Sequence, residues 1–265
     1  RTTLKLTDED MNRKVSLRFN GINYRADLWV NGKKVAGKEE FAGTYNMFSF
    51  NIDNFKLSGE NTVALEIWQY ADGEYSIGFV DWNPLPVDRN MGIFREVFLE
   101  INDGIKIRSP FVYSKLNKAS DGSAELFIQT ELTNSTDKPV KGILVINYEL
   151  GEVTKEITVK PGENVSCRFD PADFPQLNVK DAELWYPNGM GKPKLYNITA
   201  EFISGRKILD RVEKKYGIRE IRSYLDKDKN RVFEINGEFV LIKGGGWTDD
   251  VFLQDTKKSV EAQLK

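Results

Sequence analysis

The residues best suited to chemistry lie close together in one poorly periodic stretch of the sequence. They are the carboxylates of Asp81 and Asp88, the amide of Asn83, the guanidinium of Arg89 and the indole of Trp82. Such polar groups hydrogen-bond sugar hydroxyls, while an aromatic face can cover a pyranose ring. The same residues fit a structural loop held by a buried tryptophan and an ion pair from the arginine to either aspartate. From the residue types alone, the two interpretations are equally favoured.

A second candidate is the segment Gly246-Trp-Thr-Asp-Asp250, which follows a short apolar run. If that run is the first strand of a (β/α)8 barrel, Trp247 and Asp249 stand at its C-terminal end, where such folds place ligand-contacting residues. A rim aromatic that packs against the preceding domain is an equally good interpretation of Trp247.

The composition excludes several kinds of chemistry. The 265 residues contain no histidine, which rules out Ser-His-Asp triads, histidine-ligated zinc and a histidine pH switch. The single cysteine allows no disulfide within the chain, and we expect it to be an inert packing residue. With 38 basic and 40 acidic residues the net charge is −2, which gives no basic footprint for nucleic acid. We expect no cofactor and no metal.

Nothing in the sequence predicts a membrane span or a visible signal peptide. The first residue is Arg1 rather than methionine, which indicates a processed or trimmed terminus. We therefore expect a secreted or periplasmic protein rather than a cytoplasmic one.

Two further motifs have ordinary explanations. Asp226, Asp228 and Asn230 are spaced like ligands of a calcium loop, but Arg231 occupies the position that requires glycine. A polar turn is the better interpretation.

Three asparagines, Asn134, Asn164 and Asn197, fit the acceptor pattern for N-glycosylation. The pattern has meaning only in a eukaryotic secretory pathway.

The elements that must position these residues are mainly strands. Residues 15–19, 24–30, 48–52, 62–68 and 94–101 alternate or extend as strands do. Asn31-Gly32 lies between two such runs and predicts a tight hairpin turn, because both residues tolerate positive φ. These features favour a β-sandwich of the jelly-roll type over residues 1–103, incomplete at its N-terminus.

A second set of strands predicts an immunoglobulin-like β-sandwich over residues 104–222. The expected strands cover residues 105–113, 124–132, 140–150, 153–159, 164–169 and 194–203. Turn signals separate them at the spacing of an all-β domain.

The last residues, 223–265, have a different pattern. Residues 231–243 form a predicted hairpin around Asn236-Gly237, and its second arm, residues 239–242, is continuously apolar, as for a strand covered on both faces. A helix start follows from residue 255. We interpret this pattern as the first strand and helix of a (β/α)8 barrel in a third, truncated domain.

Taken in order, these segments resemble family 2 glycoside hydrolases, the group of β-galactosidases, β-glucuronidases, β-mannosidases and exo-β-glucosaminidases. Residues 21–33 and 90–95 are similar to that family's sugar-binding jelly roll, and residues 183–187 to the close of its immunoglobulin-like domain. Residues 216–221 and 233–244 are similar to the start of its barrel. Asp81-Trp-Asn-Pro84 and residues 244–253 most resemble the exo-β-glucosaminidase and β-mannosidase-like branch.

The resemblance implies a retaining exo-β-glycosidase that acts on a terminal β-glucosaminide or β-mannoside, with two glutamates on later barrel strands. No residue of this chain is then catalytic. Those implied to bind substrate are Asp81, Trp82, Asn83, Asp88, Arg89, Trp247 and Asp249. The implied partners are a carbohydrate and the chain's own C-terminal barrel, with neither nucleic acid nor membrane, and a homo-oligomer is an open possibility. A stand-alone carbohydrate-binding protein without catalysis is the alternative from another class, and a scaffolding role in oligomer contacts is a third.

Overall fold

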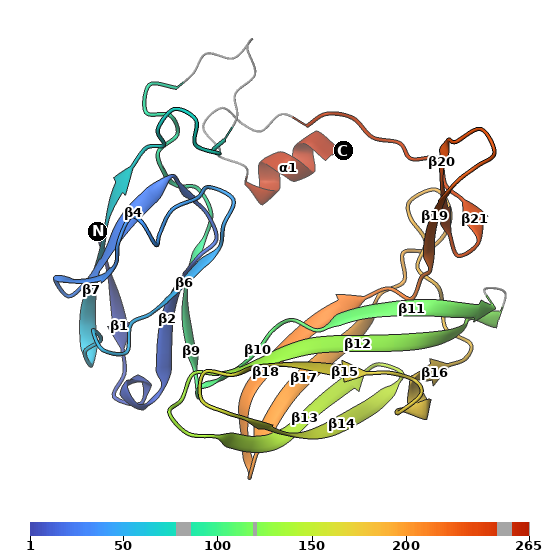
Figure 1. Cartoon of the computed structure of the whole chain (residues 1–265), viewed down its shortest axis with the longest axis horizontal. Helices are drawn as coiled ribbons and strands as arrows, with labels where there is room; N and C mark the ends of the chain where they lie inside the picture. Colours follow the sequence, from blue (N-terminus) through green and yellow to red (C-terminus); the bar gives the residue numbers. More distant parts are fainter. Residues whose placement is uncertain (78–85, 119–120, 248–255, 265) are drawn as a thin grey trace. The chain divides into compact units, whose positions relative to one another are not determined.

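A computed structural model of the chain describes residues 1–77, 86–118, 121–247 and 256–264 (Figure 1). Asp81, Trp82, Asn83 and Asp249, four of the predicted substrate contacts, lie outside these residues. The chain divides into two compact units. The first comprises Arg1–Ile101 with Gly245–Lys265, and the second comprises Asn102–Gly244.

The first unit is built from antiparallel strands, as the alternation in its sequence predicts. One sheet has the order β1-β7-β4-β5 and another the order β6-β2-β9, while β3 and β8 form a short pair. The bounds are β1 (Thr2–Leu6), β2 (Lys14–Phe19), β3 (Ile22–Asn23), β4 (Arg25–Val30), β5 (Lys33–Ala36), β6 (Phe48–Asn51), β7 (Gly59–Trp68), β8 (Gly92–Ile93) and β9 (Val97–Asn102), with a 3-10 turn at Asp10–Asn12.

Period-two alternation places the apolar side chains of β2 in the core of this unit. Val15, Leu17 and Phe19 are all buried, whereas the residues between them are partly exposed. Phe41 lies at the centre, with its ring centroid 4.9 Å from that of Phe19. Burial of one such ring stabilises the fold by about 2–3 kcal/mol. The core thus follows from the pattern of the sequence.

The turn between β4 and β5 is the predicted one. Asn31 has φ 50° and Gly32 has φ 75°, and Val30 pairs with Lys33 across them. Positive φ at both central residues is the geometry of a type I′ turn. The Asn31 side chain also donates to the backbone oxygen of Phe55 (2.9 Å), which ties the turn to the neighbouring loop.

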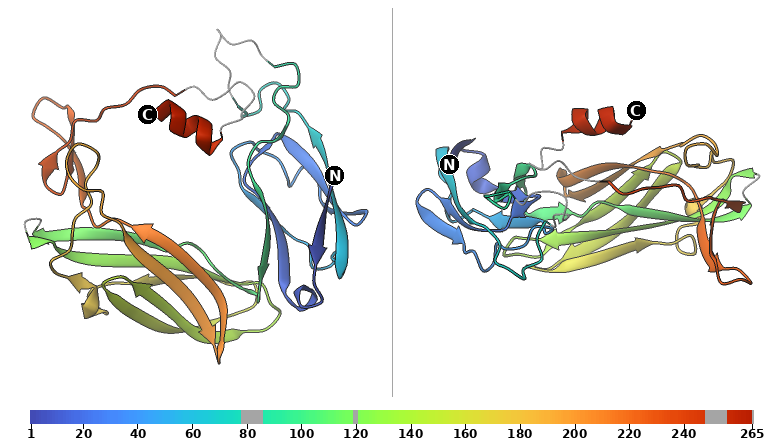
Figure 2. Two further views of the ribbon diagram at one scale, coloured as in Figure 1. Left: turned by 180° about the vertical axis from the view of Figure 1, so that it is seen from behind. Right: turned by 90° about the horizontal axis from the view of Figure 1, so that it is seen from above.

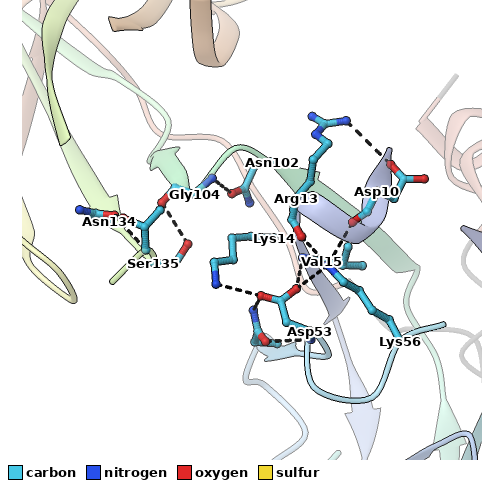
Figure 3. Close-up of polar contacts among 12 residues, drawn as sticks. Asp10, Arg13, Lys14, Val15, Asp53, Lys56, Asn102, Gly104, Asn134 and Ser135 are labelled. Atoms are coloured by element: carbon cyan, nitrogen blue, oxygen red, sulfur yellow. Dashed lines mark hydrogen bonds and ion pairs between the residues drawn. The ribbon is translucent and has the colours of Figure 1, made fainter. Parts of the chain in front are cut away.

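A buried lysine closes one end of the first unit (Figure 3). The Lys56 ammonium donates to the backbone oxygens of Asp10 (3.0 Å) and Arg13 and to the Asp53 carboxylate (3.1 Å). Asp53 also accepts from the backbone N–H of Val15 (2.8 Å). Burial alone would raise the pKa of Asp53, but hydrogen bonds, Lys56 among their donors, outweigh it and lower that pKa. We call this set of five residues the closed end.

The second unit is a sandwich of two sheets, and Figures 1 and 2 show the sheets as two facing layers. One sheet contains β10, β11, β12, β15 and β16, and the other has the order β14-β13-β17-β18. The bounds are β10 (Ile105–Ile107), β11 (Phe111–Lys118), β12 (Ser123–Asn134), β13 (Val140–Tyr148), β14 (Gly151–Val159), β15 (Asn164–Phe169), β16 (Asn178–Val179), β17 (Tyr196–Ser204) and β18 (Lys207–Tyr216), with a 3-10 turn at Pro175–Leu177.

The core of this unit forms from residues of both layers, among them Leu126, Leu144 and Phe202. Cys167 is buried there, and burial raises the pKa of its thiol. Its burial confirms the predicted packing position. Gly104, with φ 92°, begins the unit in a turn: its N–H donates to the Asn102 side chain (2.8 Å) and its oxygen accepts from Ser135 (Figure 3).

Two details of the second unit differ from the sequence prediction. The expected strand over residues 105–113 is broken into β10 and β11, because Pro110 has no N–H for a ladder. β18 was not predicted. It lies at an edge of its sheet and carries charged residues such as Asp210 and Arg211, which obscure the alternation.

The hairpin near the C-terminus forms around Asn236 (φ 54°) and Gly237 (φ 82°), as predicted. It belongs to a sheet of order β19-β20-β21, with β19 (Ile221–Leu225), β20 (Arg231–Ile235) and β21 (Glu238–Phe239). The prediction that residues 239–242 form one buried strand is wrong in this structure. The strand ends at Phe239, and Leu241 and Ile242 are 66% and 63% exposed, because no layer among the described residues covers them.

A helix, α1 (Lys257–Leu264), lies where the sequence predicts a helix start. Among the described residues, the structure has no helix long and apolar enough to span a membrane. The barrel that would contain this helix stays a prediction.

Candidate functional site

Three of the predicted substrate contacts are described by the structure. Asp88 and Arg89 lie together in the turn that follows Pro86, whose oxygen accepts from the N–H of Arg89 (2.9 Å). Trp247 is partly exposed and, among the described residues, no hydrogen bond, ion pair or ring contact joins it to that turn. The site is therefore built from the turn and its neighbours.

Arg89 binds a partner that the sequence analysis did not identify. Its Nη1 lies 2.9 Å from Oδ1 of Asp72, and its guanidinium lies 5.1 Å from the ring centroid of Tyr70. Of the two ion pairs considered for a structural loop, the one between Asp88 and Arg89 does not form, and Asp88 accepts from the N–H of Asn90 (3.0 Å), while Asp81 lies outside the described residues. Asp72 is 92% exposed, so this ion pair orients Arg89 and adds little stability.

A buried asparagine holds this turn against the sandwich. The Nδ2 of Asn23 donates to the backbone oxygens of Arg89 (3.0 Å) and Asn90 (3.1 Å), and its Oδ1 accepts from the Thr44 hydroxyl (2.7 Å). Asn23 and Thr44 are both buried. Arg89 and Asn90 have φ near 50°, a conformation that is costly outside glycine and persists where neighbouring groups fix it. Asn23 therefore determines the shape of the turn.

The sequence analysis did not identify Asn23 as a functional residue. One signal was available, because a single amide stands in Gly21-Ile-Asn-Tyr24 just before an apolar strand. A polar side chain at a buried position must find hydrogen-bond partners, and here those partners are the loop carbonyls.

A second segment, residues 69–77, lies at the same end of the first unit. Arg25, at the start of β4, forms an ion pair with Glu74, and Glu74 accepts from the N–H of Ala71 (2.6 Å). The Tyr45 hydroxyl donates to the backbone oxygen of Ser76 (3.2 Å). The segment is therefore held from two sides, by the ion pair of Glu74 and by the hydrogen bond from Tyr45.

Two exposed tyrosines meet at this end. The ring centroids of Tyr45 and Tyr75 lie 5.3 Å apart with an angle of 49° between the ring planes. We call these two residues the tyrosine pair. Residues 41–47 and 86–93, which contact Asn23, and residues 69–77, which are joined to them through Tyr45 and Arg89, are called the loop end.

The loop end combines groups that suit a polyhydroxylated ligand. Asp72, Glu74 and Asp88 offer carboxylates, and Arg25 and Arg89 offer guanidinium groups. Carboxylates accept hydrogen bonds from hydroxyls and guanidinium groups donate to them, while the tyrosine rings offer apolar faces. These are the kinds of group that contact sugars, and four of them form ion pairs in this structure, Arg25 with Glu74 and Arg89 with Asp72.

Two surface hollows lie away from the loop end, and neither contains a predicted residue. One lies on β4 and β7 and is lined by Arg1, Trp29, Asn31, Gly32, Thr62 and Ala64. The other lies on β13, β17 and β18 and is lined by Asn147, Glu149, Asn197, Thr199, Glu201 and Arg211. In the second hollow the charges satisfy one another, since Arg211 lies 2.8 Å from Glu201 and Glu149 accepts from Asn197. Because neither hollow contains a predicted substrate contact, we keep the loop end as the candidate site.

The prediction of a polar turn at Asp226 is confirmed. Its Oδ1 accepts from the backbone N–H groups of Asn230 (2.8 Å) and Asp228 (2.9 Å). Hydrogen bonding, first from the Asn230 backbone, lowers the pKa of Asp226. The carboxylate is thus occupied by its own turn.

Asn134, one of the three asparagines that fit the glycosylation pattern, is fully buried. Its Nδ2 donates to the backbone oxygens of Lys138 (2.8 Å) and Val159 (2.9 Å). The folded protein therefore cannot be glycosylated there, whereas Asn164 and Asn197 are exposed.

Comparison with known proteins places both units in one family. The model of the sugar binding domain of glycosyl hydrolases family 2 matches residues 1–102, and a second model of glycosyl hydrolases family 2 matches residues 105–219. The two matches meet near the boundary between the compact units.

The relatives by sequence are long glycoside-cleaving enzymes. An exo-β-D-glucosaminidase of Streptomyces avermitilis is 29% identical over 260 residues, which cover 98% of this chain and 29% of that protein. A mannosylglycoprotein endo-β-mannosidase of Lilium longiflorum is 29% identical over 295 residues, covering 96% of this chain and 29% of that protein. The crystal structure of the exo-chitosanase CsxA of Amycolatopsis orientalis matches with a TM-score of 0.85 and 28% identity, covering 99% of this chain and 30% of that one. The chain spans less than a third of the length of each relative.

Proposed function

Because the chain belongs to glycosyl hydrolase family 2, we propose that it is the non-catalytic N-terminal part of a retaining exo-β-glycosidase. The proposed substrate is a terminal β-linked glucosamine or mannose unit. In a retaining mechanism two carboxyl groups stand about 5 Å apart, one as acid and one as nucleophile. We place both on the part of the full-length protein that follows this chain.

The relatives support the choice of sugar. Two exo-β-D-glucosaminidases, from Streptomyces avermitilis and Amycolatopsis orientalis, each match over 98% of this chain, and the Lilium enzyme is named for a β-mannoside. A β-galactosidase of Thermoanaerobacter pseudethanolicus also matches, at 27% identity over 92% of this chain. Because these names belong to the relatives, the substrate must be tested on this protein.

The loop end is the observation that carries the proposal for the site. Asn23 fixes the turn of Asp88 and Arg89, and that turn borders the stretch with Asp81, Trp82 and Asn83. We propose that the side chains of this turn and stretch form the rim of the terminal sugar subsite. They are Asp81, Trp82, Asn83, Asp88 and Arg89. Trp247 and Asp249 are proposed as further contacts.

Hydrolysis of nitrophenyl glycosides tests the function. The full-length protein and the 265-residue chain are each assayed on p-nitrophenyl β-glucosaminide, β-mannoside, β-galactoside and β-glucuronide. We expect the full-length protein to cleave the glucosaminide or the mannoside fastest and the 265-residue chain to cleave none. Turnover by the chain would contradict the placement of the carboxyl groups. Activity on galactosides alone would contradict the proposed sugar.

Saccharide binding without any hydrolysis by the full-length protein would favour the alternative, a carbohydrate-binding protein. The same preparation can be tested by isothermal titration with glucosamine and mannose oligosaccharides. This measurement separates loss of catalysis from loss of recognition.

A further inference from the structure

We propose that the tyrosine pair forms a stacking platform for a second sugar unit, so that the protein prefers β-linked oligosaccharides over single-sugar glycosides. This inference deepens the proposed function and rests on it for the identity of the substrate. The platform is distinct from the turn of Asp88 and Arg89, which is proposed to contact the terminal sugar of the substrate.

Both rings of the tyrosine pair are exposed. Tyr45 is 60% exposed and Tyr75 is 82% exposed, and neither belongs to the buried core of the first unit. Scattered exposed aromatics are ordinary, but two large rings in contact with each other form a continuous apolar surface in water. Because neither ring belongs to that core, the surface that the rings form can contact a ligand.

The pair is also held in place before any ligand binds. The hydroxyl of Tyr45 is hydrogen-bonded to the backbone of Ser76, the residue after Tyr75. On the other side of Tyr75, Glu74 is anchored to β4 through Arg25. Rings that are already oriented lose little conformational entropy on binding, so stacking retains most of its free energy.

The surroundings of the pair fit a saccharide better than a protein partner. A pyranose with equatorial substituents has flat faces of C–H groups and a rim of hydroxyls, so it needs an aromatic face beside hydrogen-bonding groups. Asp72 and Glu74 lie three residues and one residue before Tyr75 and carry carboxylates, and Asp72 is almost fully exposed.

The position of the tyrosine pair indicates a contact with the second sugar of the substrate rather than with its terminal sugar. The ion pair between Asp72 and Arg89 joins residues 69–77, which contain Tyr75, to the turn proposed for the terminal sugar. An oligosaccharide whose terminal sugar contacts that turn can place its next sugar over the neighbouring tyrosine rings. The platform would therefore affect longer substrates selectively.

The test compares two substrates in the full-length protein. Rates are measured on p-nitrophenyl β-glucosaminide and on a glucosamine tetrasaccharide for the wild type, Tyr75→Ala, Tyr45→Ala and Tyr75→Trp. The matched control is Tyr113→Ala, which removes another exposed tyrosine, from β11 of the second unit.

We expect Tyr75→Ala to lower the ratio of kcat/KM on the tetrasaccharide to kcat/KM on the nitrophenyl glycoside by about fivefold to tenfold, through KM. Tyr75→Trp should restore the ratio, and Tyr113→Ala should leave it at the wild-type value. An unchanged ratio in Tyr75→Ala, or an equal loss on both substrates, would overturn the platform.

The outcome separates the platform from the proposed function. If the wild type cleaves glucosaminides and the ratio does not respond, the platform is wrong and the function stands. If the wild type cleaves neither substrate, tetrasaccharide binding is measured by isothermal titration. Weaker binding by Tyr75→Ala than by Tyr113→Ala would then support the platform while the proposed hydrolysis fails, and equal binding would overturn the platform as well.

Discussion

The two ends of the first unit use buried polar groups for opposite purposes. At the closed end, Lys56 and Asp53 satisfy each other and the surrounding backbone, and the sandwich is sealed. At the loop end, Asn23 is buried and satisfied as well, but its partners are the backbone oxygens of a surface turn. One set of contacts stabilises the sandwich, and the other shapes a surface around exposed rings. The contrast supports the loop end as the place where we propose that a ligand binds.

The largest expected effect is at the closed end. Replacing Lys56 by methionine leaves the Asp53 carboxylate and two backbone oxygens without their buried cation, which should cost about 3 kcal/mol of stability. Hydrogen exchange of peptides from residues 1–101 in rising urea measures this loss. The exposed Lys5, changed to methionine, is the control. If the two variants unfolded at the same urea concentration, the closed end would not be a stabilising centre.

Asn23→Ala should have a smaller and more local effect. Two loop oxygens and the Thr44 hydroxyl lose a buried partner, which we expect to cost about 2 kcal/mol. Faster hydrogen exchange at residues 86–93 and a lower kcat/KM are the expected results, while peptides of the closed end stay protected. Thr44→Val, which removes one hydrogen bond, should cost about 1 kcal/mol. Uniform loss of protection across the unit would contradict a positioning role.

The pH dependence of stability sharpens the comparison further. The pKa of Asp53 is lower in the folded protein than the ordinary aspartate value of 3.8, so the folded state favours the ionised carboxylate. Its contribution to stability is present above pH 3.8 and is lost as the pH falls through the folded pKa. Urea unfolding between pH 6 and pH 3 should show this loss in the wild type and a flatter profile in Asp53→Asn. Identical slopes of stability against pH in the wild type and Asp53→Asn would show that groups other than Asp53 determine the pH dependence.

The smallest effect on stability is expected for the tyrosine pair. Tyr75→Ala removes an exposed ring outside the core, so stability should change by no more than about 0.5 kcal/mol. Thermal unfolding beside the wild type measures it. A large loss would mean that the rings stabilise the fold, and a binding role would lose its main support.

Local patterns allowed most of the fold to be predicted from the sequence. Alternation places Val15, Leu17 and Phe19 in the core, and Asn31-Gly32 specifies its turn through the conformations that the two residues tolerate. Both signals act within a few residues. The edge strand β18 was not predicted, because its many charged residues face solvent and hide the alternation of apolar and polar residues that marks a core-facing strand.

The candidate site was less predictable, because its geometry depends on distant pairs. Asn23 binds a turn 66 residues away, and the partner of Arg89 is Asp72 rather than the adjacent Asp88. Composition indicated the stretch from Asp81 to Arg89 as a candidate site, and its role stays a prediction. It could not identify the tyrosine pair, since Tyr45 and Tyr75 meet only after the strands between them have paired.

Hydrogen exchange of the full-length protein with a bound saccharide tests the central claim most directly. The ligand is a sulfur-linked glucosamine disaccharide, which resists hydrolysis, and exchange is compared with and without it. We predict added protection at residues 69–77 and 86–93 and none at the closed end. Protection confined to other peptides, or equal at both ends of the first unit, would contradict the account.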